Sequence, residues 1–229
     1  MIADKLAQVN ARIASACAAA LRPVQSVTLL AVSKTFPAQD VREACTANQF
    51  RFGENYVQEG LDKIAALADL REILEWHLIG PLQSNKTRAV AESFDWVHSI
   101  DRLKIAERLS AQRPAELPPL SVCVQVNISG EASKGGVEPG DVPALAQAVA
   151  ALPRLRLRGL MAIPAPADRK DMEAQRRPHR QLHALLQRLR RDGLPVDTMS
   201  AGMSDDLEAA IAEGATLVRV GSALFGARR

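Results

Sequence analysis

The sequence has few aromatic residues and few cysteines, and each shortage excludes a class of protein. Aromatic side chains make up 3% of the chain, whereas alanine, leucine and valine are abundant, which favours alternating strands and helices over an aromatic-rich β-sandwich. The three cysteines, Cys17, Cys45 and Cys123, are odd in number and far apart, so they fit neither a disulfide framework nor a paired metal motif. We therefore predict a reducing compartment, the cytoplasm, and no metal site.

Long apolar runs and linkers are also missing. Residues 1–9 carry Asp4 and Lys5 within an amphipathic pattern, so they form neither a signal core nor a membrane span, and we expect no membrane partner. No low-complexity segment and no extended Pro/Gly/Ser linker divides the 229 residues. A chain of this length can bury a substantial core, and we predict that residues 1–229 form a single domain.

Positive charge is concentrated in one stretch of the chain. The net charge is only +3, yet residues 154–191 contain eleven Lys and Arg against three Asp and Glu. Four leucines fall at helical spacing among these arginines, and no aromatic residue interleaves with them to stack on bases. We interpret residues 178–191, which start at Pro178 and end at Arg191, as a helix with a solvated basic face, and we expect no nucleic-acid partner.

Strands and helices alternate along the chain. Apolar residues at steps of three or four predict an N-terminal helix that ends near Arg22 and Pro23. The apolar run at residues 27–32, closed by Pro37, predicts the first strand. Further strands, with helices between them, are predicted at residues 50–53, 75–79, 96–100, 120–127, 157–163, 196–200 and 217–220.

Eight such strands predict an α/β fold: a single (β/α)8 TIM barrel with an extra N-terminal helix. The rival is an open doubly wound sheet, which normally carries a glycine-rich loop after its first strand. Residues 33–37 read Ser-Lys-Thr-Phe-Pro and contain no glycine, so the barrel is favoured. In such barrels functional residues gather at the C-terminal ends of the strands, and phosphate commonly binds at the loops after strands seven and eight.

Lys34 follows the first predicted strand directly and allows two interpretations. It can be a solvated loop residue, as most lysines are. It can also be an amine in a partly apolar mouth of the barrel that forms a Schiff base with a carbonyl compound. The residues near Lys34 in the predicted barrel decide between these two interpretations.

Two loops predicted beside Lys34 carry groups that bind phosphate. Residues 200–204 follow strand seven and Gly221-Ser222 follow strand eight, and their glycines, hydroxyls and amides suit a phosphate. Strand eight closes against strand one, so Lys34 would lie beside this site, an arrangement that fits pyridoxal 5'-phosphate (PLP). Alternatively, Ser204 only caps a helix that begins at Asp205, and Gly221 is an ordinary turn residue.

Arg219, near the end of the last predicted strand, adds a chemical constraint. An arginine that faces the barrel mouth is costly unless it has a partner. If it faces the pyridine nitrogen of PLP, its guanidinium can only donate, so that nitrogen stays unprotonated. Such a ring is a poorer electron sink than one paired with a carboxylate, which disfavours carbanion chemistry of the transaminase kind.

Seven motifs run in order across nearly the whole chain, each at or near the end of a predicted strand. They are Ala-Val-Ser-Lys at 31–34, Phe-Gly-Glu-Asn-Tyr at 52–56, His-Leu-Ile-Gly-Pro-Leu-Gln-Ser-Asn-Lys at 77–86, Val-Asn-Ile at 126–128, Gly-Leu-Met-Ala-Ile-Pro at 159–164, Ser-Ala-Gly-Met-Ser-Asp at 200–205 and Val-Arg-Val-Gly-Ser at 218–222. Together these motifs resemble the pyridoxal phosphate homeostasis protein family, the YggS or PROSC type.

The resemblance implies a barrel like the N-terminal domain of alanine racemase, with PLP held as a lysine aldimine. The family binds and buffers the cofactor in intracellular PLP (vitamin B6) homeostasis, without established catalytic turnover, and PLP-dependent apoenzymes are the implied partners. The implied cofactor-binding residues are Lys34 as the Schiff-base lysine, Ser200, Gly221 and Ser222 at the phosphate, Arg219 at the pyridine nitrogen, and Asn55 and Met161 lining the cofactor.

Some of these positions also have ordinary structural interpretations. Asn55 can cap a helix through an Asn-x-x-Gln box. His77 and His98 lie inside predicted strands, and we interpret them as core histidines with satisfied hydrogen bonds, since no spacing with Cys, Asp or Glu suggests a metal. The chain also has Ala201 where many family members have Met, and Ser222 where many have Thr; Ser222 keeps the hydroxyl.

Two catalytic alternatives remain beside the carrier. A PLP-dependent amino-acid racemase needs a second acid or base opposite the lysine, which alanine racemase takes from a second domain. We expect no room for that domain after Arg229, and nothing places Tyr56, the only tyrosine, opposite Lys34. A Schiff-base lyase of the aldolase kind would need a phosphorylated substrate at the two loops. We therefore predict a non-catalytic PLP carrier that is a monomer.

Overall fold

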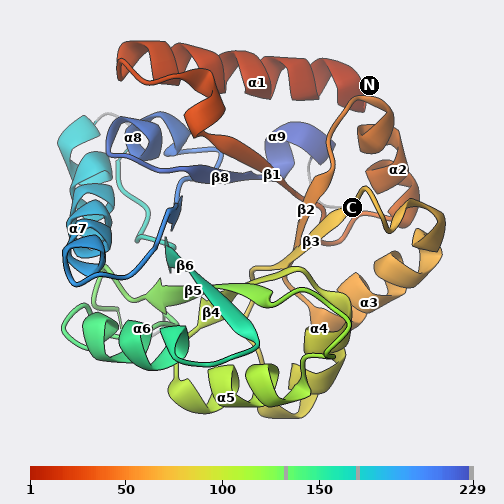
Figure 1. The fold of residues 1–229 in the computed structure, drawn as a ribbon. Helices are drawn as coiled ribbons and strands as arrows, with labels where there is room; N and C mark the ends of the chain where they lie inside the picture. The colour runs from red at the N-terminus through yellow and green to blue at the C-terminus, as the bar shows by residue number, and fades with distance from the viewer. Residues whose placement is uncertain (132–133, 169–170, 227–229) are drawn as a thin grey trace.

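The computed structural model describes residues 1–131, 134–168 and 171–226, and within them eight parallel strands form a closed barrel (Figure 1). Each strand pairs with its neighbours in the sequence, and β8 pairs with β1 to complete the circle. The predicted TIM barrel is therefore confirmed. The strands are β1 Thr28–Val32, β2 Arg51–Glu54, β3 Glu75–Leu78, β4 Trp96–Ile100, β5 Leu120–Val126, β6 Leu155–Ala162, β7 Thr198–Ser200 and β8 Leu217–Val220.

Helices form a ring around the outside of the barrel, and one follows each strand (Figure 1). The four-residue helix after β8 has no counterpart in the sequence prediction. Within the described residues, none of the helices has the length and apolar character needed to cross a bilayer. The helices are α1 Ile2–Ala19, α2 Ala38–Thr46, α3 Val57–Ala66, α4 Thr87–Ser93, α5 Leu103–Gln112, α6 Val142–Ala150, α7 Met172–Arg191, α8 Leu207–Ala212 and α9 Ser222–Phe225.

The first strand shows how the two faces of the barrel wall are filled. Leu30 and Val32 pack in one cluster, whereas Leu29 and Ala31 belong to the larger core that includes residues of the surrounding helices. Successive side chains of a strand point to opposite faces, so the first pair faces the barrel interior and the second pair faces the helices. Both faces are buried, which explains the continuous apolar run in the sequence.

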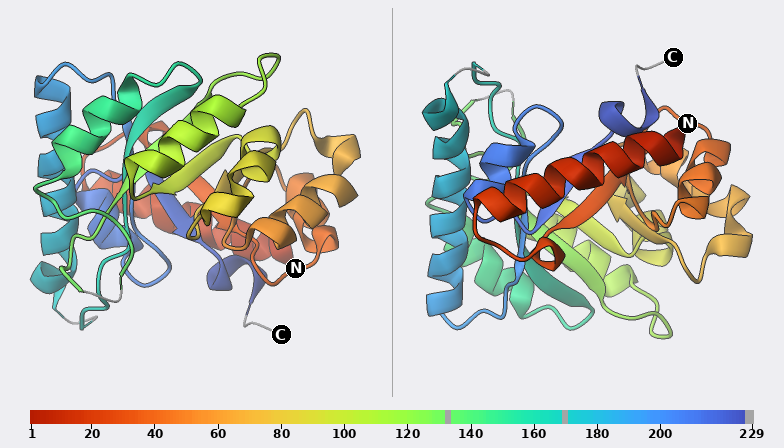
Figure 2. Two further views of the ribbon diagram at one scale, coloured as in Figure 1. Left: turned by 90° about the horizontal axis from the view of Figure 1, so that it is seen from below. Right: turned by 90° about the horizontal axis from the view of Figure 1, so that it is seen from above.

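The predicted N-terminal helix, α1, lies across the outside of the barrel and packs on α8, α9 and α2 (Figure 2). Its buried stripe includes Leu6, Val9, Ile13 and Cys17, which recur at helical spacing. Beyond its end, Arg22 donates to the carbonyl oxygen of a residue in α8 at 2.7 Å. This helix covers the wall of the barrel where β8 meets β1.

Helix α7 begins at Met172, six residues before the predicted start, so the prediction that it starts at Pro178 is wrong. The Asp171 side chain accepts a hydrogen bond from the amide of Ala174 at 2.9 Å and caps the helix further upstream. Pro178 therefore lies inside the helix, where it removes one backbone donor. Proline is common at the first position of a helix, and for this reason the sequence pattern placed the start of the helix at Pro178.

Part of the basic face of α7 is paired with acidic residues. Arg176 and Arg180 donate to Glu213 at 2.7 and 3.0 Å, and Arg180 also pairs with Glu173. The opposite face buries leucines, as the helical spacing predicted. Arg169 and Lys170, which belong to the same basic stretch of the sequence, lie outside the described residues.

Candidate functional site

A cavity of about 310 Å³ lies among the loops that follow the C-terminal ends of the strands. Functional residues of TIM barrels lie at this end. The cavity brings together five of the seven predicted site residues, and the other two, Ser200 and Met161, are not among the residues that line it. The five are Lys34, Asn55, Arg219, Gly221 and Ser222.

Lys34 reaches the cavity because of the alternation along β1. Val32 faces the barrel interior and Ser33 faces the helices, so Lys34 takes the next inward position at the mouth. Directly after it, Thr35 has a φ of +68°, in the left-handed region that side chains other than glycine rarely adopt. The chain therefore turns sharply beside a half-buried Lys34.

A buried ion pair anchors this turn on the helix side. The ammonium group of Lys63, on α3, donates to the Ser33 carbonyl oxygen at 2.6 Å and to the Glu54 carboxylate at 2.7 Å. The Ser33 hydroxyl donates to the same carboxylate oxygen at 2.6 Å. Glu54 is fully buried and Lys63 is nearly so, so this cluster fixes the backbone next to Lys34.

A second carboxylate extends the cluster to the other side of the turn. Glu59 accepts from Lys63 at 2.7 Å and from the backbone amide of Thr35. Burial raises the pKa of Glu54, and the neighbouring Lys63 ammonium opposes this rise. Glu54, Glu59 and Lys63 were not predicted as a cluster, since the only signal in the sequence is a glutamate at the end of a buried strand.

Arg219, on β8, is 3% exposed and is held by uncharged partners. Its guanidinium donates to the carbonyl oxygens of Ser200 and Ala162 at 2.7 and 2.8 Å, and to the Ser200 hydroxyl at 2.7 Å. Burial lowers the pKa of Arg219 to about 10, against the pull of the Asp206 carboxylate. The group is therefore still a cation at neutral pH and presents a fixed donor to the cavity.

Small polar groups line the side of the cavity where β8 ends. The hydroxyl oxygens of Ser204 and Ser222 lie 3.5 Å apart, next to the backbone of Gly221. A Cβ atom at Gly221 would lie 3.0 Å from the carbonyl oxygen of Val32, so glycine permits the close approach of the β8 and β1 ends. Hydroxyls and an accessible backbone are the groups that suit a phosphate.

The alternative interpretations of Ser204 and Asn55 as helix caps are wrong. Helix α8 starts after Asp206 without a side-chain cap, and the Asp206 carboxylate accepts from the Met203 amide at 2.7 Å, so Ser204 is not its cap. Helix α3 starts after Tyr56, also without a side-chain cap, so Asn55 is not its cap either. Both side chains instead line the cavity.

Asn55 carries an unmet hydrogen-bonding group. Its side-chain oxygen, Oδ1, is buried and has no hydrogen-bond partner. The loop after β3 presses against the same residue, because a Cβ atom at Gly80 would lie only 2.0 Å from the Asn55 carbonyl oxygen. A buried amide oxygen without a partner is costly, and a molecule bound in the cavity can satisfy it.

Ser200 and Met161 lie inside the barrel, away from the cavity wall. Ser200 is fully buried and bonds Arg219 and His98, and Met161 packs with Trp96 and Cys123. Ser200 thus contacts the cavity only through Arg219. Met203 and Ser204, from the predicted phosphate loop at residues 200–204, also line the cavity. Other described residues that line it were not predicted as site residues, namely Val32, Phe36, Ile79, Ile163, Asp205 and Gly226.

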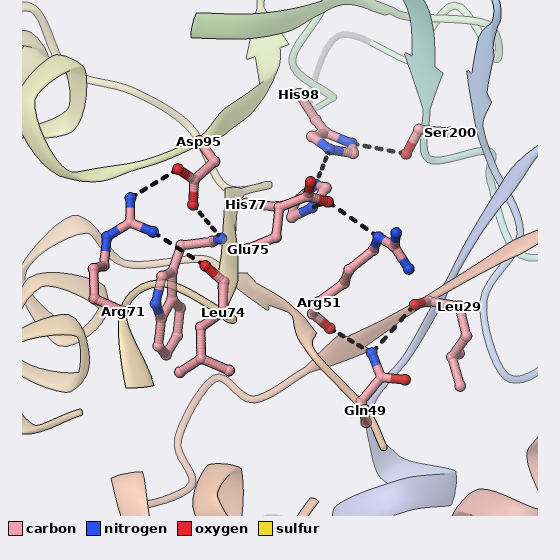
Figure 3. A network of polar contacts seen from close by, with 11 residues as sticks. Leu29, Gln49, Arg51, Arg71, Leu74, Glu75, His77, Asp95, His98 and Ser200 are labelled. Carbon is pink, nitrogen blue, oxygen red and sulfur yellow. Dashed lines mark hydrogen bonds and ion pairs between the residues drawn. The ribbon is translucent and has the colours of Figure 1, made fainter. Parts of the chain in front are cut away.

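His77 and His98 form a fully buried hydrogen-bonded pair in the barrel interior (Figure 3). His77 Nδ1 lies 2.9 Å from His98 Nε2, and the outer nitrogens contact Glu75 at 2.8 Å and Ser200 at 2.9 Å. The prediction of satisfied core histidines is confirmed. In the part of the chain that the structure describes, no group of three or more His, Cys, Asp or Glu residues could hold a metal ion.

The fold and the cavity define a class of protein: TIM barrels that present a lysine from the first strand and an arginine from the last strand at one mouth. The chain belongs to the family described as alanine racemase, N-terminal domain, whose family model matches residues 5–229.

Two relatives and one solved structure show the likeness in detail. The pyridoxal phosphate homeostasis protein of Pseudomonas aeruginosa is 63% identical over 227 residues, which cover 99% of this chain and 96% of that protein. The protein of that name in Escherichia coli K12 is 57% identical over 228 residues, covering 99% and 97%. The structure of PipY of Synechococcus elongatus with PLP bound has a TM-score of 0.83 and 38% identity, covering 99% and 100%. The family resemblance drawn from the seven motifs is confirmed.

Proposed function

We propose that this chain binds PLP at the C-terminal mouth of its barrel through a covalent bond to Lys34. In this proposal it serves intracellular PLP homeostasis as a carrier without catalytic turnover. The observation that carries the proposal is the joint placement of Lys34, Arg219 and the Ser204–Ser222 pair in one cavity. The names of the two relatives and the PLP-bound structure of PipY support it.

The residues of the cavity fit the cofactor chemically. PLP supplies an aldehyde that reacts with an amine and a ring that can withdraw electrons. Lys34 would provide the amine, Arg219 would donate to the ring nitrogen, and the Gly221 backbone with Ser222 and Ser204 would hold the phosphate. The unpartnered oxygen of Asn55 supports a ligand at this place. A cavity of about 310 Å³ is also of the size that small-molecule sites have.

Ser200 and Met161 have supporting roles in this proposal. Ser200 is the hydroxyl partner of Arg219, and Met161 fills the barrel interior. Their contribution to cofactor binding is therefore indirect, through the position of the guanidinium and the packing below it.

A PLP-dependent amino-acid racemase is less well supported. Racemisation by two bases needs a second proton-transfer group opposite the lysine. Among the described residues of the cavity wall, the ionisable side chains are Lys34, Asp205 and Arg219. Arg219 stays protonated at neutral pH, and Tyr56 is 61% exposed and does not line the cavity. Asp205 is therefore the residue to substitute in an assay for racemisation.

Partners and location complete the proposal. We propose that PLP-dependent apoenzymes receive the cofactor, and that residues 1–229 act as one monomeric domain in the cytoplasm. Lys34 is half-buried and Ser222 is exposed, which suits a cofactor that has to leave again. Sedimentation of the loaded protein and transfer of PLP to an apo-aminotransferase test these points.

The decisive experiment for function is α-proton exchange into a panel of amino acids in heavy water. Protein loaded with PLP is compared with free PLP at the same concentration, and the Asp205→Asn variant is run beside it. The proposal predicts exchange no faster than with free PLP. Exchange of one amino acid many times per protein molecule, lost in Asp205→Asn, would instead establish a racemase-like enzyme.

A further inference from the structure

A continuous line of polar side chains crosses the barrel interior and ends at Arg219. It starts with Glu75, at the N-terminal mouth of the barrel, which contacts His77 at 2.8 Å. His77 contacts His98 at 2.9 Å, His98 contacts Ser200 at 2.9 Å, and Ser200 accepts from Arg219 at 2.7 Å (Figure 3 shows all but the last residue). Five strands contribute to this line or its end: β3, β4, β7 and β8 supply its members, and Arg51 of β2 donates to Glu75 at 3.2 Å.

The direction of every hydrogen bond in this line is fixed by its two ends. An ionised Glu75 only accepts, so His77 must donate from Nε2. A neutral His77 then accepts at Nδ1 from the Nε2–H of His98, and a neutral His98 accepts at Nδ1 from the Ser200 hydroxyl. Ser200 in turn accepts from Arg219, whose guanidinium only donates. Burial lowers the pKa of both histidines, which keeps them neutral.

The interior of the line is shielded from water. His77, His98 and Ser200 are fully buried, and the Trp96 ring stacks on His77 with a centroid distance of 5.2 Å. Only Glu75 is exposed, with 38% of its side chain accessible. Barrel interiors are usually filled by branched apolar side chains. Replacing buried charged groups by apolar side chains of similar volume often leaves the stability of a protein unchanged or raises it. Stability alone therefore gives little reason for this line.

The line also connects the buried Arg219 cation to an anion at the opposite mouth of the barrel. Within the described residues, Arg219 has no ion pair with a carboxylate, and its guanidinium donates to two carbonyl oxygens and a hydroxyl. Glu75 supplies a negative charge at the opposite mouth, and the bonds between them all point from the cation to the anion. Such chains polarise along their length, so each acceptor is strengthened by the next.

We propose that Glu75, His77, His98 and Ser200 are positioning residues. They hold the Arg219 guanidinium and transmit to it the polarising effect of the negative charge on Glu75. This inference rests on the proposed function, because it assigns the line a role in tuning the ring nitrogen of PLP. The charge of Glu75 strengthens Ser200 as an acceptor and raises the electron density on the guanidinium. Arg219 is then a weaker donor to the ring nitrogen, and removing the charge makes it a stronger one.

The test is the nitrogen-15 NMR resonance of the ring nitrogen in protein loaded with labelled PLP. Glu75→Gln keeps an oxygen that accepts from His77 and removes the charge, so the resonance is expected to move upfield, towards that of a protonated ring. Asp197→Asn is the matched control, because Asp197 lines the same N-terminal cavity as Glu75 but bonds Arg158 and Thr198 outside the line. No shift with Glu75→Gln, or an equal shift with Asp197→Asn, would overturn the proposal.

A second variant tests the line next to Arg219. Ser200→Ala removes the hydroxyl with little change in volume and is expected to weaken PLP binding about tenfold, the loss expected for a hydrogen bond to a charged group. It should also abolish the response of the ring nitrogen to Glu75→Gln. If the response persists in the double variant, the charge acts through space, and the line is not its path.

Histidine NMR of the PLP-free protein separates the failure of this inference from failure of the proposed function. The line requires that His77 and His98 both carry their proton on Nε2, which nitrogen-15 resonances report directly. Another tautomer in either residue would overturn the line whether or not PLP binds. Absence of PLP binding with both protons on Nε2 would overturn the proposed function and the tuning role, while the line itself would stand as a structural element.

Discussion

At the residue scale, the cluster beside Lys34 contains a buried ion pair. Glu54 and Lys63 are both buried, and each compensates the charge of the other. Removing one partner of a buried pair leaves an uncompensated charge, which is far more damaging than removing both. The geometry of the turn that carries Lys34 therefore depends on residues that never touch the cavity.

Lys63→Met should lower the free energy of unfolding by about 3 kcal/mol, because it leaves Glu54 buried without a cation. Urea unfolding measures this change. The double variant Lys63→Met, Glu54→Gln serves as the control and should lose clearly less than the sum of the two single variants. A double variant whose loss equals that sum would show that the two residues are not coupled.

Arg219→Glu should change the chemistry of the bound ring. A carboxylic group in place of the guanidinium can share a proton with the ring nitrogen and make the ring a better electron sink. We expect slow transamination products when the loaded variant is incubated with amino acids, measured by chromatography of the keto acids. Arg219→Gln is the neutral control. A product profile unchanged from that of the native protein would contradict the assigned role of Arg219.

Single residues were predictable where position on a strand decides the role. Lys34 and Arg219 were found because they sit at strand ends on the inward face. Asn55 matched a capping box, but the contact that decides its place comes from Gly80 in another loop, which a local pattern does not show. Ser200 has the right residue type for a phosphate, yet its side chain faces the barrel interior beside His98.

At the scale of elements, the cavity depends on the contact between the loops after β2 and β3. Gly80→Ala would place a Cβ atom 2.0 Å from the Asn55 carbonyl oxygen, so one of the loops must move. We expect PLP affinity to fall at least tenfold, as measured by spectroscopic titration. Gly140→Ala is the control, since nothing lies within 4 Å of a Cβ atom there. Equal affinities of the two variants would show that this contact does not shape the site.

Elements were predicted well where a periodic pattern is continuous, and poorly where a local signal competes with packing. The buried run of β1 and the apolar stripe of α1 are both found at their predicted places. The predicted start of α7 was wrong because proline is common at the first position of a helix, and Pro178 fits that pattern. The residue that caps the helix, Asp171, lies upstream. Helix α9 has four residues, too few to produce a period.

At the scale of the whole molecule, the buried histidines make stability depend on pH. Burial lowers the pKa of His77 and His98 in the folded state, so below the ordinary value of about 6.5 the unfolded chain binds more protons than the folded one. Acidification in this range therefore favours unfolding.

Between pH 6.5 and 5 the free energy of unfolding should fall as the pH falls. His98, whose pKa burial lowers further than that of His77, contributes up to one proton, or about 1.4 kcal/mol per pH unit, and His77 adds to this slope. Urea unfolding at a series of pH values measures the slope. His98→Gln should reduce it by up to one proton. A flat profile across this range would contradict the neutral, buried state of the pair.

The architecture of the whole molecule followed from the number and order of strands, because eight alternating units and a glycine-free first loop leave few other topologies. The line from Glu75 to Arg219 did not follow, since its members are spread over β3, β4, β7 and β8 and only the closed barrel brings them together.

The central claim, that Lys34 holds PLP, is tested most directly by reducing the loaded protein with borohydride and mapping the labelled peptide. We predict one modified site, Lys34, that is lost in Lys34→Ala and kept in Lys86→Ala, since Lys86 is an exposed lysine that does not line the cavity. A label of equal yield in the Lys34→Ala variant, or a label on another lysine of the native chain, would contradict the account.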